Sequence, residues 1–193
     1  MFKYDKKIDI ENWERITAKS KKCGGFIFGD SFPTSYKVTE QSIKKAEEKI
    51  PEYDNAWEKY KEKFYTGMHK IFKKEFPKDV SFYINTSPFS YFNTEKKYIS
   101  ISMSCKFVIP HVLHEANHYM FKKYYQDKLK ETQSHDDVKE IFSVVNNDVF
   151  KPMNDPYWAK YEEKRSRVLK KWTKTQDIDQ VIEYINNNYK DRN

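Results

Sequence analysis

Residues 114 to 118 are His-Glu-Ala-Asn-His, and this pentad constrains the chain more than any other segment. Two histidines that are four residues apart lie one turn above each other only on an α-helix. On such a helix His114 and His118 can offer two imidazole nitrogens to one tetrahedral Zn²⁺, and Glu115 can act as general base toward a metal-bound water. With 5 histidines in 193 residues, random placement gives this pattern in about one chain in a hundred. The pentad therefore predicts a helix that carries a metal site.

The residues around the pentad favour that helix. Pro110 suits a first helical turn, where its missing N–H is no loss, and the pattern predicts a helix from Pro110 to about Tyr125, directly after a strand. His111 lies one turn before His114, but three ligands from one helix strain a tetrahedral site, so we interpret His111 as a residue at its mouth or behind its ligands. The competing interpretation is a polar helix face with solvated histidines.

Hydrophobic periodicity predicts two helices and then strands ahead of the pentad. Apolar spacings of three and four indicate one helix after Thr39 and a second from near Asp54. The period changes to two over residues 80–84, and residues 90–103 predict a hairpin with its turn near residues 93–96. Together these segments predict a small antiparallel sheet with one face buried.

The two ends of the chain give weaker signals. Residues 1–38 indicate a helical turn near Trp13 and a Gly-containing loop over residues 23–33, in which residues 27–28 could form a short strand. Behind the pentad, Ser134 can cap a helix over residues 137–146, and Asp155 can begin a long amphipathic helix. Asp177 predicts the start of a last short helix.

Length and hydropathy bound the class of protein. A chain of 193 residues is expected to form one domain. A mean hydropathy of −0.98 argues against a membrane protein. The start, Met1-Phe-Lys-Tyr-Asp-Lys-Lys, has no apolar segment typical of a secretory signal, and two cysteines suit a reducing compartment, so we expect a cytoplasmic protein.

A formal net charge of +7 raises the question of nucleic-acid binding. The excess is nearly all lysine, whereas phosphate and base recognition favours the bidentate fork of arginine. The lysines are also spread along the whole chain. Solvated helix faces explain this charge better than a nucleic-acid partner does.

A catalytic zinc site normally has three protein ligands and one open position, so the pentad leaves one ligand to be found. The metzincin pattern needs a histidine where this chain has Tyr124, which excludes that class. Glu140 is our first choice, because Ile141 and Val145 would anchor its helix in the core. The alternative for Glu140 is a solvated carboxylate paired with a lysine. His135 is the rival third ligand.

Residues 110–118, residues 139–146 and, more loosely, residues 156–158 resemble small bacterial HExxH proteins that are predicted metallopeptidases of the gluzincin type. The resemblance implies an α+β, zincin-like fold in one domain over residues 1–193. N-terminal helices and a small antiparallel sheet would occupy residues 1–109. The HExxH active-site helix, a ligand helix and C-terminal helices would occupy residues 110–193.

The resemblance also implies a function, namely zinc-dependent hydrolysis of peptide bonds in a peptide or protein substrate. Zn²⁺ would be bound by His114, His118 and Glu140, with Glu115 as general base. A tyrosine or histidine often assists the oxyanion in such enzymes, and Tyr157 is the candidate, although a core aromatic at a helix start explains it equally well. Zincins commonly bind substrate along an edge strand, for which we expect residues 98–104.

Larger gluzincins place an acid where this chain has Val144, so the partner that orients a zinc-bound histidine must come from elsewhere, and Ser143, Asn147 and a backbone carbonyl are candidates. Two other functions remain open. A three-histidine site with His135 would resemble SprT-like proteases, which act on protein bound to DNA. A non-catalytic basic helical protein with a vestigial pentad would bind nucleic acid or a protein partner.

Overall fold

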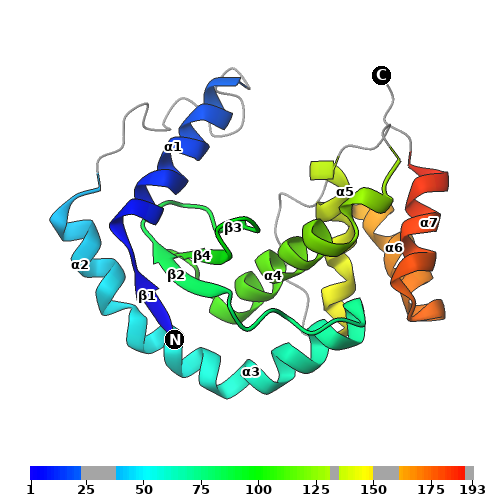
Figure 1. The fold of residues 1–193 in the computed structure, drawn as a ribbon, viewed down its shortest axis with the longest axis horizontal. Helices are drawn as coiled ribbons and strands as arrows, with labels where there is room; N and C mark the ends of the chain where they lie inside the picture. The colour runs from blue at the N-terminus through cyan, green and yellow to red at the C-terminus, as the bar shows by residue number, and fades with distance from the viewer. Residues whose placement is uncertain (23–37, 131–134, 150–160, 190–193) are drawn as a thin grey trace.

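The computed structural model describes residues 1–22, 38–130, 135–149 and 161–189. Over these residues the chain forms an α+β fold with a small mixed sheet (Figure 1). In chain order the elements are β1 (Phe2–Tyr4), α1 (Lys6–Lys22), α2 (Glu40–Glu48), α3 (Ile50–Phe72), β2 (Ser81–Asn85), β3 (Tyr91–Asn93), β4 (Tyr98–Ser102), α4 (Val108–Tyr124), the 3-10 helix η1 (Gln126–Lys128), α5 (His135–Phe142), the 3-10 helix η2 (Ser143–Asp148), α6 (Glu162–Thr175) and α7 (Ile178–Asn188). Within the described segments, no helix has the length and apolar character that a membrane crossing requires.

The strand order is β1-β2-β4-β3, and the sheet is mixed. β1 pairs with β2 and β2 with β4 in parallel, whereas β3 runs antiparallel to β4. The predicted hairpin is confirmed, and the Asn93 side chain closes its turn by accepting hydrogen bonds from the backbone N–H groups of Glu95 (3.0 Å) and Lys96 (2.9 Å). The prediction of an antiparallel sheet is wrong because alternation of apolar and polar residues looks the same in parallel and antiparallel strands.

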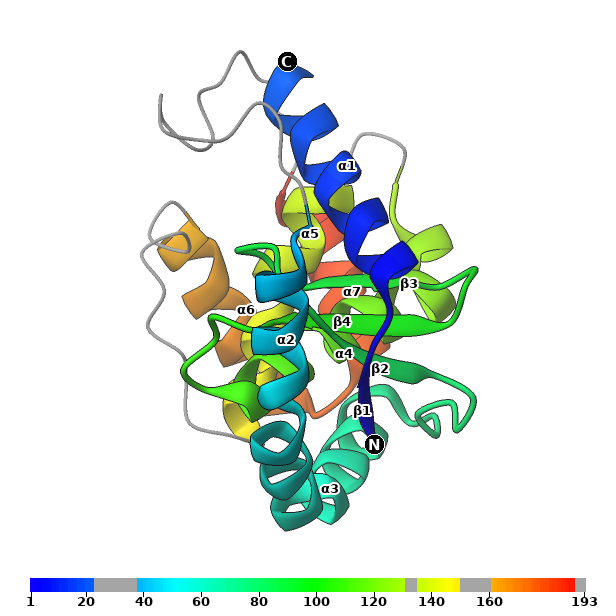
Figure 2. The ribbon, with the colours of Figure 1, turned by 90° about the vertical axis from the view of Figure 1, so that its left-hand side faces the viewer.

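Both faces of β4 are buried, so the expectation of one solvated sheet face is also wrong. Ile99 and Ile101 belong to the hydrophobic core. On the other face the Ser100 hydroxyl accepts hydrogen bonds from Asn12 of α1 (2.9 Å) and Asn85 of β2 (2.7 Å). Helix α1 thus covers a polar sheet face, and α4 lies on the opposite side of the sheet (Figures 1 and 2).

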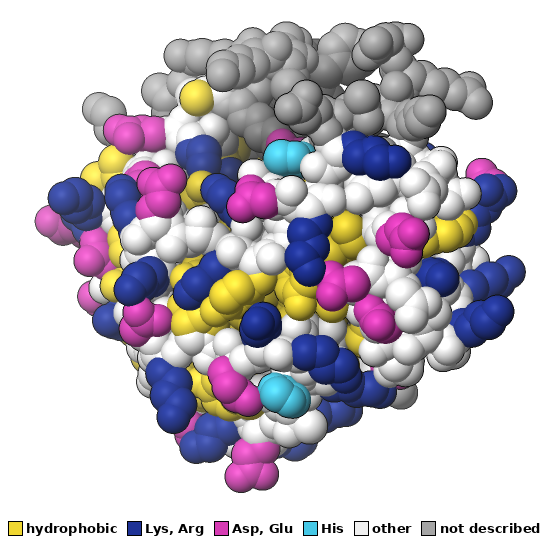
Figure 3. Space-filling model, turned by 45° about the vertical axis from the view of Figure 1, so that its right-hand side comes forward, with side chains coloured by type: hydrophobic (Ala, Val, Ile, Leu, Met, Phe, Trp, Pro, Cys, Tyr) yellow, Lys and Arg dark blue, Asp and Glu magenta, His cyan; other side chains and the backbone are white. Residues whose placement is uncertain are grey.

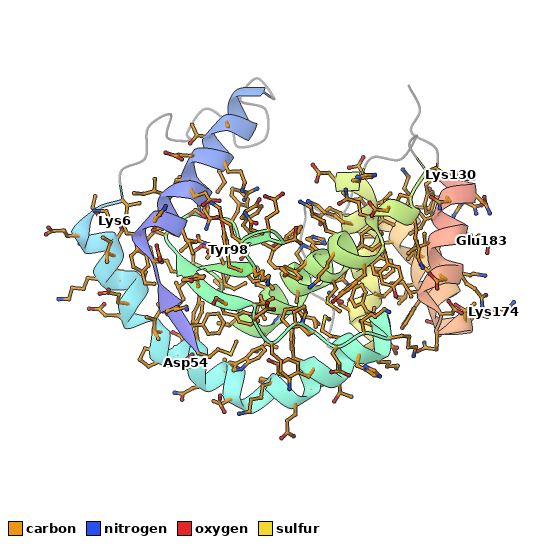
Figure 4. All side chains as sticks on the ribbon, in the orientation of Figure 1. Lys6, Asp54, Tyr98, Lys130, Lys174 and Glu183 are labelled. Atoms are coloured by element: carbon orange, nitrogen blue, oxygen red, sulfur yellow. The ribbon has the colours of Figure 1, made fainter. Side chains whose placement is uncertain are left out.

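Helix α1 docks through hydrogen bonds more than through apolar contact. The buried carboxylate of Asp9 accepts from the backbone N–H of Thr86 (3.0 Å) and from its hydroxyl (2.8 Å). The indole N–H of Trp13 donates to the same hydroxyl at 3.0 Å. Tyr98 extends from the sheet toward α1 (Figure 4), where its hydroxyl donates to Glu11 at 3.3 Å. Such a helix has no continuous apolar stripe, which explains why the sequence indicates only one turn here.

Helices α2 and α3 follow the predicted pattern with one shifted boundary. Thr39 caps α2 as predicted, and its hydroxyl accepts from the backbone N–H of Ser42 at 3.1 Å. Helix α3 begins at Ile50 rather than near Asp54, because Pro51 falls in the first turn, where a proline is tolerated. The aromatic stripe of α3 is in the core, and the rings of Trp57 and Phe82 lie 5.1 Å apart between centroids.

The second half of the chain also departs from its predicted boundaries. Helix α4 begins at Val108, two residues before Pro110. The segment predicted as one helix over residues 137–146 is α5 followed by η2. Asp177 caps α7 as predicted, accepting from two backbone N–H groups at 2.9 and 3.1 Å. The predicted loop over residues 23–33, the predicted cap Ser134 and the predicted helix start at Asp155 lie outside the described residues, and the single domain stays a prediction.

Gly67 permits a close approach between α3 and the residue that follows η2. A Cβ atom at this buried position would lie 2.4 Å from Cγ1 of Val149. Glycine to alanine in an exposed helix stabilises a protein by about 1 kcal/mol, but overpacking costs about 1–3 kcal/mol. We therefore expect Gly67→Ala to lower the free energy of unfolding in urea titrations. Thr66→Ala, at an exposed neighbouring position, is the matched control.

The close approach of Val149 to Gly67 also predicts that a second substitution restores stability. Gly67→Ala combined with Val149→Ala should recover stability relative to Gly67→Ala alone, because the second change removes the two Cγ atoms that lie nearest to a new Cβ. A Gly67→Ala protein as stable as the wild type would contradict this close packing.

Candidate metal centre

Three of the predicted site residues lie together in the structure. His114 and His118 are on α4, and their ring centroids are 4.1 Å apart. Glu140 approaches them from α5, with one carboxylate oxygen 3.5 Å from Nε2 of His114 and the other 3.2 Å from Nε2 of His118. One donor atom from each residue lies within 4.8 Å of the others, so this group can hold a metal ion.

Helix α4 places the histidines at the boundary of the core. Val112, Leu113, Ala116 and Met120 are buried within the hydrophobic core, which sets the rotation of the helix. The side chain of His118 is 3% exposed and that of His114 15% exposed. One imidazole is therefore enclosed and the other keeps access to solvent from one side.

Helix α5 places the carboxylate. Ile141 and Phe142 are fully buried, and the Phe142 ring lies 4.9 Å from the Phe121 ring of α4 and 5.9 Å from the Phe72 ring of α3. These apolar contacts fix one face of a short helix and leave Glu140 beside the two histidines, 14% exposed.

A buried amide pair locks the ligand segment to α4. Asn117, between the two histidines, donates its side-chain N–H to the side-chain oxygen of Asn146 at 2.8 Å. Asn146, on η2, donates in turn to the backbone carbonyl of Leu113 at 3.3 Å. The bonds join η2, and with it the adjoining α5, to the helix turn that carries His114 and His118. Neither asparagine belongs to a pattern that would mark it in the sequence.

Arg165 of α6 supports Glu140 from behind. Its buried guanidinium donates to the backbone carbonyl of Glu140 and, at 2.9 Å, to the hydroxyl of Ser143. Ser143 itself donates to that same carbonyl at 2.8 Å. Ser143 was expected to orient a histidine, but its hydroxyl orients the ligand helix instead. The signal that could have revealed Arg165 is its type, an arginine in a chain whose cations are mostly lysine.

The electrostatics of the cluster favour the protonation states that metal ligands need. Burial lowers the pKa of His114 well below its usual value, and the neighbouring charge of His118 adds to this shift. Burial acts to raise the pKa of Glu140, but His118, His114 and Lys139 outweigh it, so this pKa lies below its usual range. At neutral pH His114 is neutral and Glu140 is ionised, the states in which they bind cations.

His118 has no hydrogen-bond partner for either ring nitrogen among the described residues, although both nitrogens are buried. Its Nε2 is 3.2 Å from Glu140, yet the alignment of the two groups does not make a hydrogen bond. Buried polar atoms are nearly always satisfied, so an orphaned pair on one ring calls for an explanation. An ion between Nε2 and the carboxylate would satisfy the first nitrogen.

The other predicted site residues are not part of this group of three. The rival ligand His135 begins α5, is exposed, and is not in the group that can hold an ion. His111 is half-buried, and its Nδ1 is 2.9 Å from the backbone carbonyl of Phe107. Tyr157 lies outside the described residues. Glu115 is next to His114 and buried, and burial raises its pKa, an effect that the charge of His118 partly offsets.

Comparison with known proteins gives no relative, since no family model, no curated protein and no solved structure matches the chain.

The amide pair generates a prediction about stability. Asn146→Ala should lower the free energy of unfolding by about 1–3 kcal/mol, because a buried N–H group of Asn117 loses its acceptor. Asn147→Ala, at the half-buried neighbouring position, is the control and should change stability much less. Urea titrations measure both. Equal effects of the two substitutions would show that the pair does not join η2 to α4.

Proposed function

We propose that this protein is a zinc-dependent peptidase with a minimal zincin-like fold. The observation that carries the proposal is the meeting of Nε2 of His114, Nε2 of His118 and the carboxylate of Glu140 around one point. Two imidazoles, a carboxylate and an open fourth position are the donor set of many catalytic zinc sites. The buried Glu115 beside them supplies a group for proton transfer.

The spacing of the donors supports zinc over a simple ion pair. Zinc bonds of about 2.0–2.2 Å at tetrahedral angles place neighbouring donor atoms about 3.4 Å apart. The two distances from Glu140 to the histidines are 3.5 and 3.2 Å. Charge-assisted hydrogen bonds between nitrogen and oxygen are shorter, typically about 2.7–2.9 Å.

The residues then take distinct roles in the reaction. A bound zinc ion supplies Lewis acidity, which polarises a peptide carbonyl and acidifies water. Glu115 accepts the proton of the attacking water and delivers it to the leaving amine. Its burial suits this role, because a carboxylate with a raised pKa is a stronger base and can also return the proton near neutral pH.

The substrate strand needs correction. β4 pairs with β2 along its whole length and with β3 over residues 98–100, so this first part of the expected substrate strand offers no free edge. β3 is the sheet edge beside the site, and its Phe92 ring is 5.9 Å from the ring of His118. We propose β3 as the strand along which an extended peptide adds.

Neither alternative function gains support from a specific contact. The SprT-like alternative needs His135 as third ligand, and His135 is exposed at the start of α5. A nucleic-acid partner needs a concentrated basic surface. On the face drawn in Figure 3, lysine and arginine side chains are scattered among acidic ones.

Metal analysis tests the proposed ligands. Protein purified without chelator should contain about one zinc ion per chain, bound by three protein ligands. Zinc binding should weaken by more than about 100-fold in each of the variants His114→Ala, His118→Ala and Glu140→Ala. A residue that only hydrogen-bonds to a zinc ligand is expected to contribute at most about 100-fold. Competition with a coloured chelator measures the affinities, and circular dichroism checks folding.

His135→Ala is the matched control, because it removes a histidine from the same helix as Glu140. This variant should bind zinc as the wild type does. Zinc-free folded protein would overturn the metal site, and a loss of affinity in His135→Ala instead of Glu140→Ala would replace the third ligand.

Glu115→Gln separates metal binding from chemistry. The variant should keep its zinc, since the side chain is not one of the three donors, and should lose about 10²–10⁴-fold in rate through loss of proton transfer. The assay is cleavage of a peptide mixture followed by mass spectrometry. Glu162→Gln, exposed on α6, removes the same charge and should leave the rate unchanged. Unimpaired cleavage by Glu115→Gln would contradict the role of Glu115.

A further inference from the structure

Arg15 on α1 is a half-buried cation without a matching anion. Within the described chain no carboxylate forms a hydrogen bond or an ion pair with its guanidinium, and its Nε is buried without a hydrogen-bond partner. Burial lowers the pKa of Arg15, which reflects the cost of keeping this charge away from water. A desolvated charge without a partner destabilises a folded protein, so its presence calls for a ligand.

The contacts of Arg15 place it on the edge strand that borders the candidate site, but on the face of the sheet that α1 covers. Its guanidinium carbon lies 3.3 Å from the centre of the Tyr91 ring, on the edge strand β3. The next residue of that strand, Phe92, contacts the ring of His118. Stacking on Tyr91 holds the planar guanidinium in place and does not use its N–H donors, which lie in the plane, and the buried Nε among them has no hydrogen-bond partner within the described chain.

The charged groups around Arg15 do not neutralise its guanidinium through a direct ion pair within the described residues. The carboxylates of Glu115 on α4 and Asp136 on α5 act on its pKa, in addition to Tyr91 and Tyr98. Asp136 already pairs with Lys139 at 2.8 Å, and that lysine stands 5.6 Å over the ring of Phe92. Arg15 is therefore a second cation whose charge acts on Glu115, and it is carried by an element on the opposite side of the sheet from α4 (Figure 1).

We propose that Arg15 binds a carboxylate group of the peptide substrate and thereby selects which peptides are cleaved. The inference rests on the proposed peptidase function for the identity of the ligand as a peptide. A guanidinium presents two parallel N–H donors that match a carboxylate, and Tyr91 fixes the plane in which they lie. An extended peptide added along β3 would pass beside this group.

The carboxylate has two sources, the C-terminus of a peptide or an aspartate or glutamate side chain. The probe is a mixture of pentapeptides with all positions randomised, prepared once with a free C-terminus and once as C-terminal amides. The mixtures are incubated with zinc-loaded Glu115→Gln protein, and the retained peptides are quantified by mass spectrometry. This binding measurement does not depend on catalysis.

We expect free-acid peptides, or amides rich in aspartate and glutamate, to be retained about tenfold or more above other peptides. Adding Arg15→Gln should abolish that preference, and Arg15→Lys should restore only part of it, because a lysine keeps the charge and loses the fork. Lys7→Gln, which removes one exposed charge from the same helix, should leave the preference intact. Preference for the free acid identifies the C-terminus, and preference for acidic amides identifies a side chain.

The same preference in Arg15→Gln as in the parent protein overturns the inference, and so does retention that ignores carboxylates. Cleavage by the wild type and by the single variant Arg15→Gln is measured in parallel on both mixtures. Arg15-dependent retention without cleavage would contradict the peptidase function alone. Cleavage that is indifferent to Arg15 and to carboxylates would contradict the role of Arg15 alone. Zinc content and thermal unfolding verify that each variant is folded.

Discussion

The candidate site depends on the docking of α5 and η2 against α4. The two histidines and the carboxylate come from separate segments, and neither segment alone offers three donors. Ring contact between Phe142 and Phe121 and the hydrogen bond between the side-chain amides of Asn117 and Asn146 hold the segments together. A buried carboxylate is costly unless charge or hydrogen bonds compensate it, so the packing holds Glu140 in a place where a cation is favoured.

The sequence predicts the donors well because their geometry is mostly local. A helix places residues four apart on one face, so the pentad defines the positions of His114 and His118 without knowledge of the fold. Glu140 could be chosen because Ile141 and Val145 show which face of its segment is buried. The choice between Glu140 and His135 needed the tertiary structure, since it depends on where the start of α5 lies.

The supporting residues could not be predicted because their contacts are polar and distant in sequence. Asn117, Asn146 and Arg165 are buried through hydrogen bonds, which leave no periodic pattern. Helix α1 is the clearest case, since it docks on serine and threonine side chains of the sheet. The sequence also does not predict that β1 pairs in parallel with β2, because a strand of three residues is too short to show an alternating pattern. Composition was more informative, since Arg165 is one of few arginines in a lysine-rich chain and donates to the backbone carbonyl of Glu140.

Both edges of the sheet are short, three residues each in β1 and β3. A long, flat edge can recruit a second copy of the chain through its unpaired backbone groups, and a short one offers too few of them to template aggregation. The same brevity limits how firmly β3 can hold an extended peptide through main-chain hydrogen bonds alone. Discrimination between peptides would then rest on side chains that flank the edge. The short edges that keep two copies of the chain from pairing also make the selection of peptides depend on those side chains.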